Sequence, residues 1–183
     1  MAGIDESRTF QPLKIAVLTV SDSRTLEDDR SGDLLVERLT TAGHELADRD
    51  IVKDDPDAIA QRFRAWIDDP MIEVVISTGG TGVTGRDITP EALLAVVEKE
   101  IQGFGEMFRM ISFQKIGTSA LQSRATAGVA KGTYLFALPG STGACKDGWD
   151  EILKNQLDVR HRPCNFAELI PRLREHEAAR PPA

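Results

Sequence analysis

A dense cluster of glycine and threonine follows a short apolar run and could bind an anion. The run 72–77 leads directly into Thr78-Gly79-Gly80-Thr81-Gly82-Val83-Thr84-Gly85, which contains four glycines and three threonines. Glycines after a strand allow backbone N–H groups to point into one cavity, where they form a nest for phosphate oxygens. Glycine pairs at a strand end often only turn the chain. The density of this cluster favours a phosphate-binding loop instead.

Two other types of glycine loop fit this segment less well. Residues 80–85 satisfy the pattern GxGxxG, so a dinucleotide-dependent oxidoreductase is an alternative. In that fold the third glycine lies in a helix that has already begun, whereas residues 86–89 intervene here. The acid that binds ribose should close the next strand, but Glu98 and Glu100 fall at the end of a predicted helix. A P-loop needs lysine followed by a hydroxyl residue, and Arg86-Asp87 replaces them.

Apolar patterning predicts strands and helices that alternate along the chain. The predicted strands are 14–21, 46–52, 72–77 and 133–138. The predicted helices are one capped by Ser31 and ending near Gly43, one at 56–69, one from Thr89-Pro90 to Ile101, one with Phe104, Met107, Phe108 and Ile111 on one face, and one from Ser141 to Leu157. This alternation predicts a mostly parallel sheet with helices on both faces. Ligands bind such sheets at the carboxyl ends of the strands, here 21–30, 53–55, 78–87 and 139–142.

Composition excludes several classes of function. The chain has 183 residues and a formal net charge of −7, which argues against a nucleic-acid partner. No apolar run approaches the roughly 20 residues that span a bilayer, and residues 1–11 do not resemble a signal peptide, so we expect a cytoplasmic protein. Cys145 and Cys164 form no CxxC motif and are interpreted as packing residues. The three histidines are scattered, and we assign them no chemistry.

A series of motifs in a fixed order resembles a known family. The motifs are Thr19-Val20-Ser21-Asp22, Lys53-Asp54-Asp55, Thr78-Gly79-Gly80-Thr81-Gly82, Arg86-Asp87-Ile88-Thr89-Pro90-Glu91, Gly103-Phe104-Gly105-Glu106, Ser123-Arg124, Leu138-Pro139-Gly140-Ser141 and Arg162-Pro163-Cys164-Asn165-Phe166. Together they resemble the molybdopterin adenylyltransferase family, which includes a domain of gephyrin. The last motif points to the branch of molybdenum cofactor biosynthesis protein B. The resemblance covers roughly residues 14–166.

The resemblance implies a fold, a reaction and an assembly. The fold is a three-layer α/β/α domain at 14–170, between an N-terminal extension at 1–13 and a polar tail at 171–183. The reaction transfers AMP from ATP to the terminal phosphate of molybdopterin, with Mg²⁺, and the assembly is a trimer or hexamer. The family's acidic pair commonly follows a proline, whereas Lys53 stands there in this chain. Members of the protein B branch differ in whether they adenylylate the pterin or only bind it.

Acidic residues at two strand ends suit this reaction. Two polyanions must be brought together, so charge neutralisation and positioning matter more than covalent catalysis. Mg²⁺ prefers carboxylate and phosphate oxygens, and we expect Asp54 and Asp87 to hold it or to orient the phosphates. A phosphate monoester is already mostly dianionic at pH 7, so no strong general base is required. Asp87 could instead only start a helix, and Asp54 could belong to a solvated turn.

The remaining candidates are expected to bind the substrates. The amides of Gly79–Gly82 and the Thr81 hydroxyl should bind phosphate, and Ser123 and Arg124 supply a hydroxyl and a guanidinium fork. The full set of expected substrate-binding residues is Ser21, Asp22, Thr78, Gly79, Gly80, Thr81, Gly82, Glu106, Ser123, Arg124, Pro139, Gly140 and Ser141. Glu106 enters through the resemblance alone. The functional hypotheses are, in order, an adenylyltransferase, a pterin-binding protein with little turnover, and a dinucleotide oxidoreductase.

Overall fold

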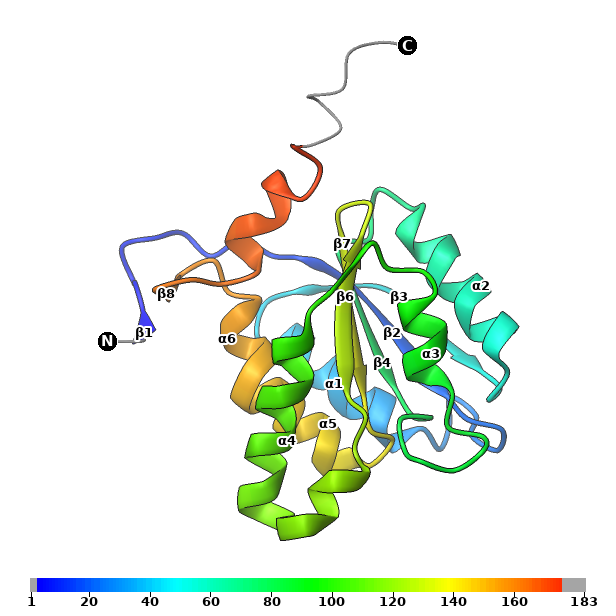
Figure 1. Cartoon of the computed structure of the whole chain (residues 1–183). Coiled ribbons are helices and arrows are strands. Elements are labelled where there is room, and N and C mark those ends of the chain that lie inside the picture. Colours follow the sequence, from blue (N-terminus) through cyan, green and yellow to red (C-terminus); the bar gives the residue numbers. More distant parts are fainter. Residues whose placement is uncertain (1–2, 176–183) are drawn as a thin grey trace.

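A six-stranded sheet in the order β3-β2-β4-β7-β6-β5 forms the centre of the computed structural model, which describes residues 3–175 (Figure 1). Its strands are β2 (Lys14–Val20), β3 (Glu45–Val52), β4 (Val74–Thr78), β5 (Lys99–Glu100), β6 (Thr126–Ala130) and β7 (Thr133–Leu138). The four strands β3, β2, β4 and β7 are parallel, whereas β6 and β5 pair antiparallel with their neighbours. The mostly parallel sheet predicted from the sequence is therefore confirmed.

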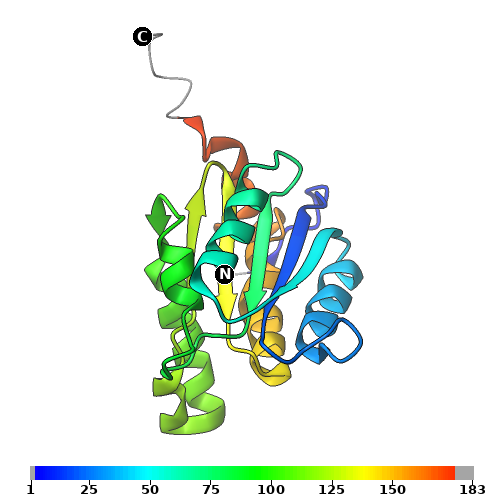
Figure 2. The ribbon, with the colours of Figure 1, turned by 90° about the vertical axis from the view of Figure 1, so that its right-hand side faces the viewer.

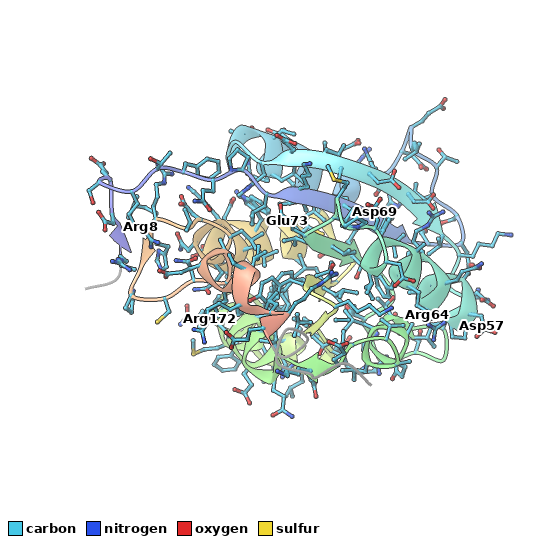
Figure 3. All side chains as sticks on the ribbon, turned by 90° about the horizontal axis from the view of Figure 1, so that it is seen from above. Arg8, Asp57, Arg64, Asp69, Glu73 and Arg172 are labelled. Atoms are coloured by element: carbon cyan, nitrogen blue, oxygen red, sulfur yellow. The ribbon has the colours of Figure 1, made fainter. Side chains whose placement is uncertain are left out.

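Helices cover both faces of this sheet, which confirms the three-layer architecture (Figures 1 and 2). They are α1 (Arg30–Thr41), α2 (Pro56–Ile67), α3 (Thr89–Leu94), α4 (Gln102–Ile116), α5 (Thr142–Gly148) and α6 (Lys154–Gln156), with η1 (Gly117–Gln122) and η3 (Ala167–Arg172) as 3₁₀ turns and η2 (Trp149–Leu153) as a π-helical segment. Side chains of α2 and α3 pack in one hydrophobic cluster, and those of α1, α4 and α5 pack in the other. Charged residues such as Asp57 on α2 lie at the outer margin (Figure 3).

Two helix starts differ from the prediction. Asp29 caps α1, because its carboxylate accepts a hydrogen bond from the N–H of Gly32, whereas the predicted cap Ser31 lies inside the first turn. Thr89 is also no side-chain cap: it is the first residue of α3, and its hydroxyl donates to the carbonyl of Gly79. The hydroxyl groups of Ser31 and Thr89 instead donate hydrogen bonds to carbonyl groups of neighbouring loops. Sequence spacing alone does not reveal these contacts.

Between α3 and β7 the predicted helix with Phe104 and Phe108 is present as α4, but the end of α3 and the strand β6 were predicted incorrectly. Helix α3 ends at Leu94 instead of continuing to Ile101, and the N–H of Glu98 donates to the carbonyl of Val129 as the chain enters the sheet. Strand β6 was missed because its sequence, rich in small residues, gives a weak strand signal. It joins β7 through Lys131 and Gly132, which have φ angles of 45° and 87°. Two residues with positive φ are typical of a tight hairpin turn. The dipeptide Lys131-Gly132 was therefore a sequence signal that could have indicated the β6–β7 hairpin.

The N-terminal segment is tied to the end of the domain. Strand β1 (Gly3–Ile4) pairs with β8 (His161–Arg162), and the guanidinium of Arg8 donates to the carbonyl of Val159 at 2.6 Å and to Glu168 (Figure 3). The predicted tail 171–183 begins within η3, and its residues 176–183 lie outside the described residues. Within residues 3–175, no helix combines the length and apolar character that a membrane span requires.

One buried histidine makes the stability of this fold pH-dependent. The side chain of His44 is 5% exposed, and its Nδ1 accepts a hydrogen bond from the N–H of Leu13 at 3.1 Å. Burial lowers the pKa of His44 to about 4. Its neutral form is therefore the one that the fold accommodates.

Lowering the pH should destabilise the protein through His44. The unfolded chain binds this proton near pH 6.5 and the folded chain only near pH 4, so the free energy of unfolding falls across that window by about 3 kcal/mol. His44→Asn lacks this titration and should lose less stability than the wild type between pH 6.5 and 4. Urea unfolding at several pH values measures the difference. Parallel pH profiles for the two proteins would contradict the assignment.

Candidate functional site

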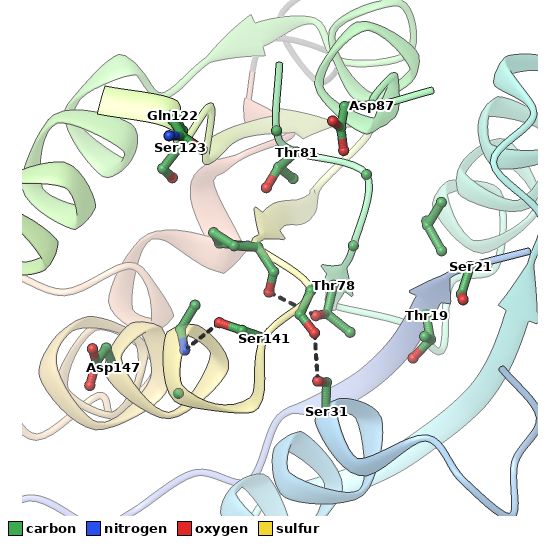
Figure 4. Close-up of a pocket in the computed structure, with 18 of the residues that line it drawn as sticks. Thr19, Ser21, Ser31, Thr78, Thr81, Asp87, Gln122, Ser123, Ser141 and Asp147 are labelled. Atoms are coloured by element: carbon green, nitrogen blue, oxygen red, sulfur yellow. Dashed lines mark hydrogen bonds between the residues drawn. The ribbon is translucent and has the colours of Figure 1, made fainter. Parts of the chain in front are cut away.

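A cavity of about 650 Å³ lies at the carboxyl ends of the parallel strands. Its walls come from the ends of β2, β4 and β7, the first turns of α1 and α5, and the segment α4–η1 (Figure 4). The predicted site residues that line it are Ser21, Asp54, Thr78, Gly79, Gly80, Thr81, Gly82, Asp87, Ser123, Pro139, Gly140 and Ser141. Segments that are far apart in the sequence thus meet where the strand-end rule predicts.

The glycine loop approaches its neighbours too closely for larger residues. Gly79 and Gly80 have φ angles of +103° and +63°, and a Cβ atom on Gly79 would lie 2.2 Å from the carbonyl oxygen of Val20. The N–H of Gly79 donates to the carbonyl of Leu138 at 3.0 Å and so extends the pairing of β4 with β7. The amide of Gly79 was predicted to bind phosphate, but the sheet already uses it.

The N–H groups of the next two residues, Gly80 and Thr81, are oriented by hydrogen bonds on the opposite side of the loop. The hydroxyl of Thr89 donates to the carbonyl of Gly79 at 2.8 Å, and the N–H of Thr89 donates to the carbonyl of Gly80 at 3.0 Å. A trans peptide points its C=O and N–H in opposite directions. The N–H groups of Gly80 and Thr81 therefore point away from Thr89, and they donate to no group in residues 3–175. Both residues line the cavity, so these donors can bind an anion there.

Two carboxylates flank this pair of amides. Cβ atoms placed on Gly80 and Gly82 would lie 3.3 Å from Asp54 Oδ1 and 2.7 Å from Asp87 Oδ2, respectively. Partial burial and repulsion from Asp22 raise the pKa of Asp54 above its ordinary value. Partial burial opposes the ionisation of Asp87, but hydrogen bonds from Thr84 outweigh it and lower its pKa. The loop therefore carries two acids in different electrostatic environments.

Asp22 lies at the edge of this acidic group and outside the cavity lining. Its carboxylate accepts a hydrogen bond from the N–H of Asp54 at 3.4 Å, and it forms an ion pair with Arg86. The Arg86 guanidinium also opposes the rise in the pKa of Asp54. Arg86 and Asp22 are both more than one third exposed, so solvent screens the pair strongly.

The start of α1 forms part of the cavity floor and was not predicted to do so. The carboxylate of Asp29 is 0% exposed and accepts hydrogen bonds from the hydroxyl of Thr19 at 2.6 Å and from Arg49 at 3.0 Å. A buried carboxylate requires such compensation. Thr19, Asp29 and Ser31 all line the cavity. The strand-end segment 21–30 was selected from the sequence, but these side chains within and beside it were not.

Hydroxyl groups connect the loop after β7 to the rest of the site (Figure 4). Ser31 donates to the carbonyl of Gly140 at 2.8 Å, and Thr78 donates to that of Pro139 at 3.0 Å. Ser141 caps α5 as predicted, since its hydroxyl oxygen accepts from the N–H of Ala144. Cys145 lies next to Thr78, and burial raises the pKa of its thiol to about 11. Cys145 therefore packs in the interior, as expected, whereas Cys164, which was also predicted to be a packing residue, is exposed.

The wall opposite the glycine loop comes from α4 and η1. The cavity-lining residues of this wall are Phe108, Ser112, Lys115, Ile116, Ser119 and Gln122. The Lys115 ammonium pairs with Asp147 on α5 at 2.6 Å and closes the far end of the wall. The sequence predicted for α4 only a helix with an apolar face. Its polar residues were missed because only the tertiary packing turns them towards the strand ends.

Glu106 and Arg124 do not line this cavity. They line a second one of about 630 Å³, on the other side of the loop, together with Glu91, Glu100 and Arg109. Ser123 borders both cavities. The structure thus places two predicted substrate-binding residues at the second cavity, while the predicted Asp22 lines neither of these two cavities.

The loop geometry differs from that of a dinucleotide-binding fold. Residues 79–88 separate β4 from α3, so Gly85 lies in the loop and not in a helix. Glu100 belongs to β5, an antiparallel strand at the far edge of the sheet, and not to the helix predicted for it. A dinucleotide site needs a parallel strand there to present the ribose-binding acid. The oxidoreductase alternative therefore has no geometric support.

A comparison with protein families identifies this architecture. A family model described as a probable molybdopterin binding domain matches residues 16–159, which is more than half of the chain. The chain belongs to the molybdopterin-binding domain family. The matched region lies within the predicted domain 14–170 and contains the segments that form the first cavity. The exact division into extension, domain and tail stays a prediction.

Individual relatives of the molybdopterin-binding domain support the same assignment. Molybdenum cofactor biosynthesis protein B of Escherichia coli strain K12 is 53% identical over 160 residues, which cover 87% of this chain and 94% of that protein. The protein of the same name from Bacillus cereus is 44% identical over 146 residues, covering 79% and 86%. A crystal structure of molybdenum cofactor biosynthesis protein B matches with a TM-score of 0.80 at 42% identity, covering 82% and 94%.

The glycine loop should not tolerate a side chain at Gly79. Gly79→Ala is expected to lower the free energy of unfolding by at least about 2 kcal/mol, because it adds a clash to an unfavourable φ angle. Gly85→Ala is the matched control, since no heavy atom lies within 4 Å of its added Cβ, and it should change stability by less than about 0.5 kcal/mol. Thermal and urea unfolding measure both values. Equal losses in the two variants would refute this account of the loop.

Proposed function

We propose that the protein binds molybdopterin and ATP in the first cavity and transfers AMP to the terminal phosphate of molybdopterin. An oxygen of the pterin phosphate bonds to the α-phosphorus of ATP, the bond to the β-phosphate breaks, and pyrophosphate leaves. Membership of the molybdopterin-binding family and the names of the relatives support a role in molybdenum cofactor biosynthesis. The observation that carries the proposal is the combination of anion-binding amides and two carboxylates on one loop.

Phosphate binding is assigned to the amides of Gly80 and Thr81. The carbonyl groups of the same two peptide units, those of Gly79 and Gly80, accept hydrogen bonds from Thr89. The two N–H groups therefore need little reorganisation when an anion binds. The Thr81 hydroxyl is a third donor on the same segment. Ser123 and Ser141 border the same cavity and offer further hydroxyl groups.

Mg²⁺ is proposed as the cation, with Asp54 and Asp87 as the residues that hold it. Residues 3–175 contain no cluster of three or more acidic, histidine or cysteine side chains arranged for a metal ion. Mg²⁺ is commonly bound by one or two carboxylates together with substrate phosphates and water, so two acids beside a phosphate-binding loop fit it. When bound, it would offset the negative charge of the phosphates that react. The raised pKa of Asp54 agrees with a carboxylate that lacks a sufficient counter-charge.

The protein residues need not supply a general base. The phosphate of the pterin is mostly dianionic at pH 7 and can attack without losing a proton. The described cavity lining contains no histidine, and the Cys145 thiol stays protonated because burial raises its pKa to about 11. The task of the residues is therefore to bind, orient and exclude water.

A molybdopterin-binding protein without turnover is the second candidate. Asp87 supports it, because one carboxylate oxygen already accepts hydrogen bonds from the N–H and the hydroxyl of Thr84 at 2.8 and 2.7 Å. An aspartate that mainly holds its own loop could shape a binding site without acting on the phosphates. The two candidates share the pterin and differ in whether pyrophosphate is released.

A homo-oligomer, a trimer or hexamer, is also proposed. The helix α4 and the adjoining η1 expose Met107, Met110, Phe113, Ile116 and Leu121, with Leu121 81% exposed. On α4, Met107, Met110 and Phe113 follow one another at i, i+3 spacing, so consecutive members of this set lie next to each other on the helix surface. An exposed apolar face of this kind is typical of a subunit contact.

Neutralising either carboxylate should abolish adenylyl transfer. The chain would be incubated with molybdopterin, ATP and Mg²⁺, and pyrophosphate release measured. Asp54→Asn and Asp87→Asn should each reduce the rate at least about 100-fold, because each removes negative charge at the cation. Asparagine at 87 retains an acceptor for Thr84, so this variant separates charge from loop structure. Asp57→Asn on the outer side of α2 is the control and should keep the wild-type rate.

The same assay separates the two candidate functions. Metal-dependent release that is lost in both variants supports the transferase. Bound pterin without pyrophosphate release by the wild type would contradict the transferase and favour the binding protein. Full activity of Asp87→Asn would show that this aspartate acts only on the loop.

A charge on the exposed face of α4 should break the oligomer. Phe113→Glu is expected to reduce the mass of the particle in solution, because a buried carboxylate in an apolar contact is unfavourable. Met71→Glu is the control, since Met71 is similarly exposed but lies just before β4, at the opposite end of the sheet. Light scattering coupled to size exclusion measures the mass. A wild type that is already monomeric would refute the oligomer.

A further inference from the structure

Arg124 lies behind the glycine loop and contacts it through its own backbone. It follows η1 and precedes β6, and its N–H donates to the carbonyl of Thr81 at 2.9 Å. The carbonyls of Gly79 and Gly80 accept hydrogen bonds from Thr89. The bond from Arg124 therefore engages the third consecutive carbonyl of the loop. The loop is therefore supported along its whole rear side by two residues.

The guanidinium of Arg124 spans the outer part of the same loop. Its Nε donates to the carbonyl of Gly82 at 2.6 Å, and its Nη2 donates to the carbonyl of Asp87 at 2.5 Å. Gly82 and Asp87 bound the turn in which Thr84 donates to the Asp87 carboxylate. One planar fork thus joins both ends of the turn that presents Asp87.

The remaining arm of the fork faces away from the first cavity. Nη1 pairs with the carboxylate of Glu91 on α3, and this hydrogen bond lowers the pKa of Glu91, which stays ionised. The guanidinium borders the second cavity, where it is about one third exposed, and it does not line the first. In this position Arg124 cannot serve as the phosphate-binding fork that the sequence suggested.

We propose that Arg124 is a positioning residue that clamps the carbonyls of Thr81, Gly82 and Asp87 and so fixes the amides and the carboxylate of the loop. The proposal rests on the proposed function only in that the ligand is a phosphate compound. A planar fork is required because two carbonyls at the ends of the turn are held at once, and lysine offers a single point charge instead. The clamp fixes the loop before the ligand arrives, which reduces the entropy lost on binding.

Arg124→Lys and Arg124→Ala test the clamp against a matched control. Amide hydrogen exchange should accelerate about tenfold or more at Thr84, Asp87 and Thr89, whose N–H groups form hydrogen bonds within the loop, because the charged donor that holds the turn is lost in both variants. Exchange in β2, β4 and β7 should stay as in the wild type. Arg109→Ala is the control: Arg109 borders the same second cavity but donates to Ala125 at 3.3 Å and does not contact the loop.

Ligand affinity and chemical rescue complete the test. The dissociation constant of Mg-ATP should rise about tenfold or more in both Arg124 variants and stay unchanged in Arg109→Ala. Guanidinium ion at millimolar concentration should partly restore the slow exchange of the loop in Arg124→Ala, since the second cavity leaves its binding position accessible. Rescue would show that the guanidinium group itself holds the loop, whereas a general loss of folding would not respond to this ion.

Several results would overturn the clamp. Unchanged exchange at Thr84, Asp87 and Thr89 in Arg124→Ala would do so, as would faster exchange with unchanged affinity. Full affinity in Arg124→Lys would also do so, because charge alone would then suffice. A wild type that neither binds Mg-ATP nor releases pyrophosphate would refute the proposed function instead. Hydrogen exchange and rescue by guanidinium would still decide the clamp.

Discussion

The hydrogen bonds that hold the rear carbonyls of the glycine loop determine the character of the whole site. The carbonyls of Gly79 and Gly80 accept from Thr89, and those of Thr81 and Gly82 accept from Arg124. Because each trans peptide points its N–H opposite to its C=O, bonds on one side create donors on the other. The loop of an acidic protein therefore presents backbone N–H donors to the cavity, independently of the lysine and arginine side chains that also line it.

The sheet topology places the two residues that form these bonds. Parallel strands β2, β4 and β7 bring their carboxyl ends together, so the loops that follow them meet at one edge. Because β6 runs antiparallel to β7, it begins at this same edge of the sheet. The segment that precedes β6 therefore reaches the rear of the loop. Helix α3 starts at the other end of the loop and supplies Thr89. A purely parallel sheet would not have delivered Arg124 to this position.

The sequence predicted those parts of the site that depend on local order. Strand ends followed by polar residues identified Ser21, the loop at 78–82 and the turn at 139–141, because the parallel arrangement follows from the alternation of elements. The wall formed by Ser112 and Lys115 was missed, since its position depends on how α4 packs across β6. The role of Arg124 could not be predicted either, because a guanidinium suits a carbonyl as well as a phosphate.

The environments of the two cysteines have a practical consequence. Cys145 lies beneath the cavity against Thr78, where burial keeps its thiol protonated, whereas Cys164 is exposed just beyond β8. Alkylating and spin-labelling reagents attack the thiolate of accessible cysteines. The wild-type chain therefore accepts a fluorophore or nitroxide at one natural position. Spectroscopy of the loop then needs only a single engineered partner label, with no cysteine removed from the floor of the cavity.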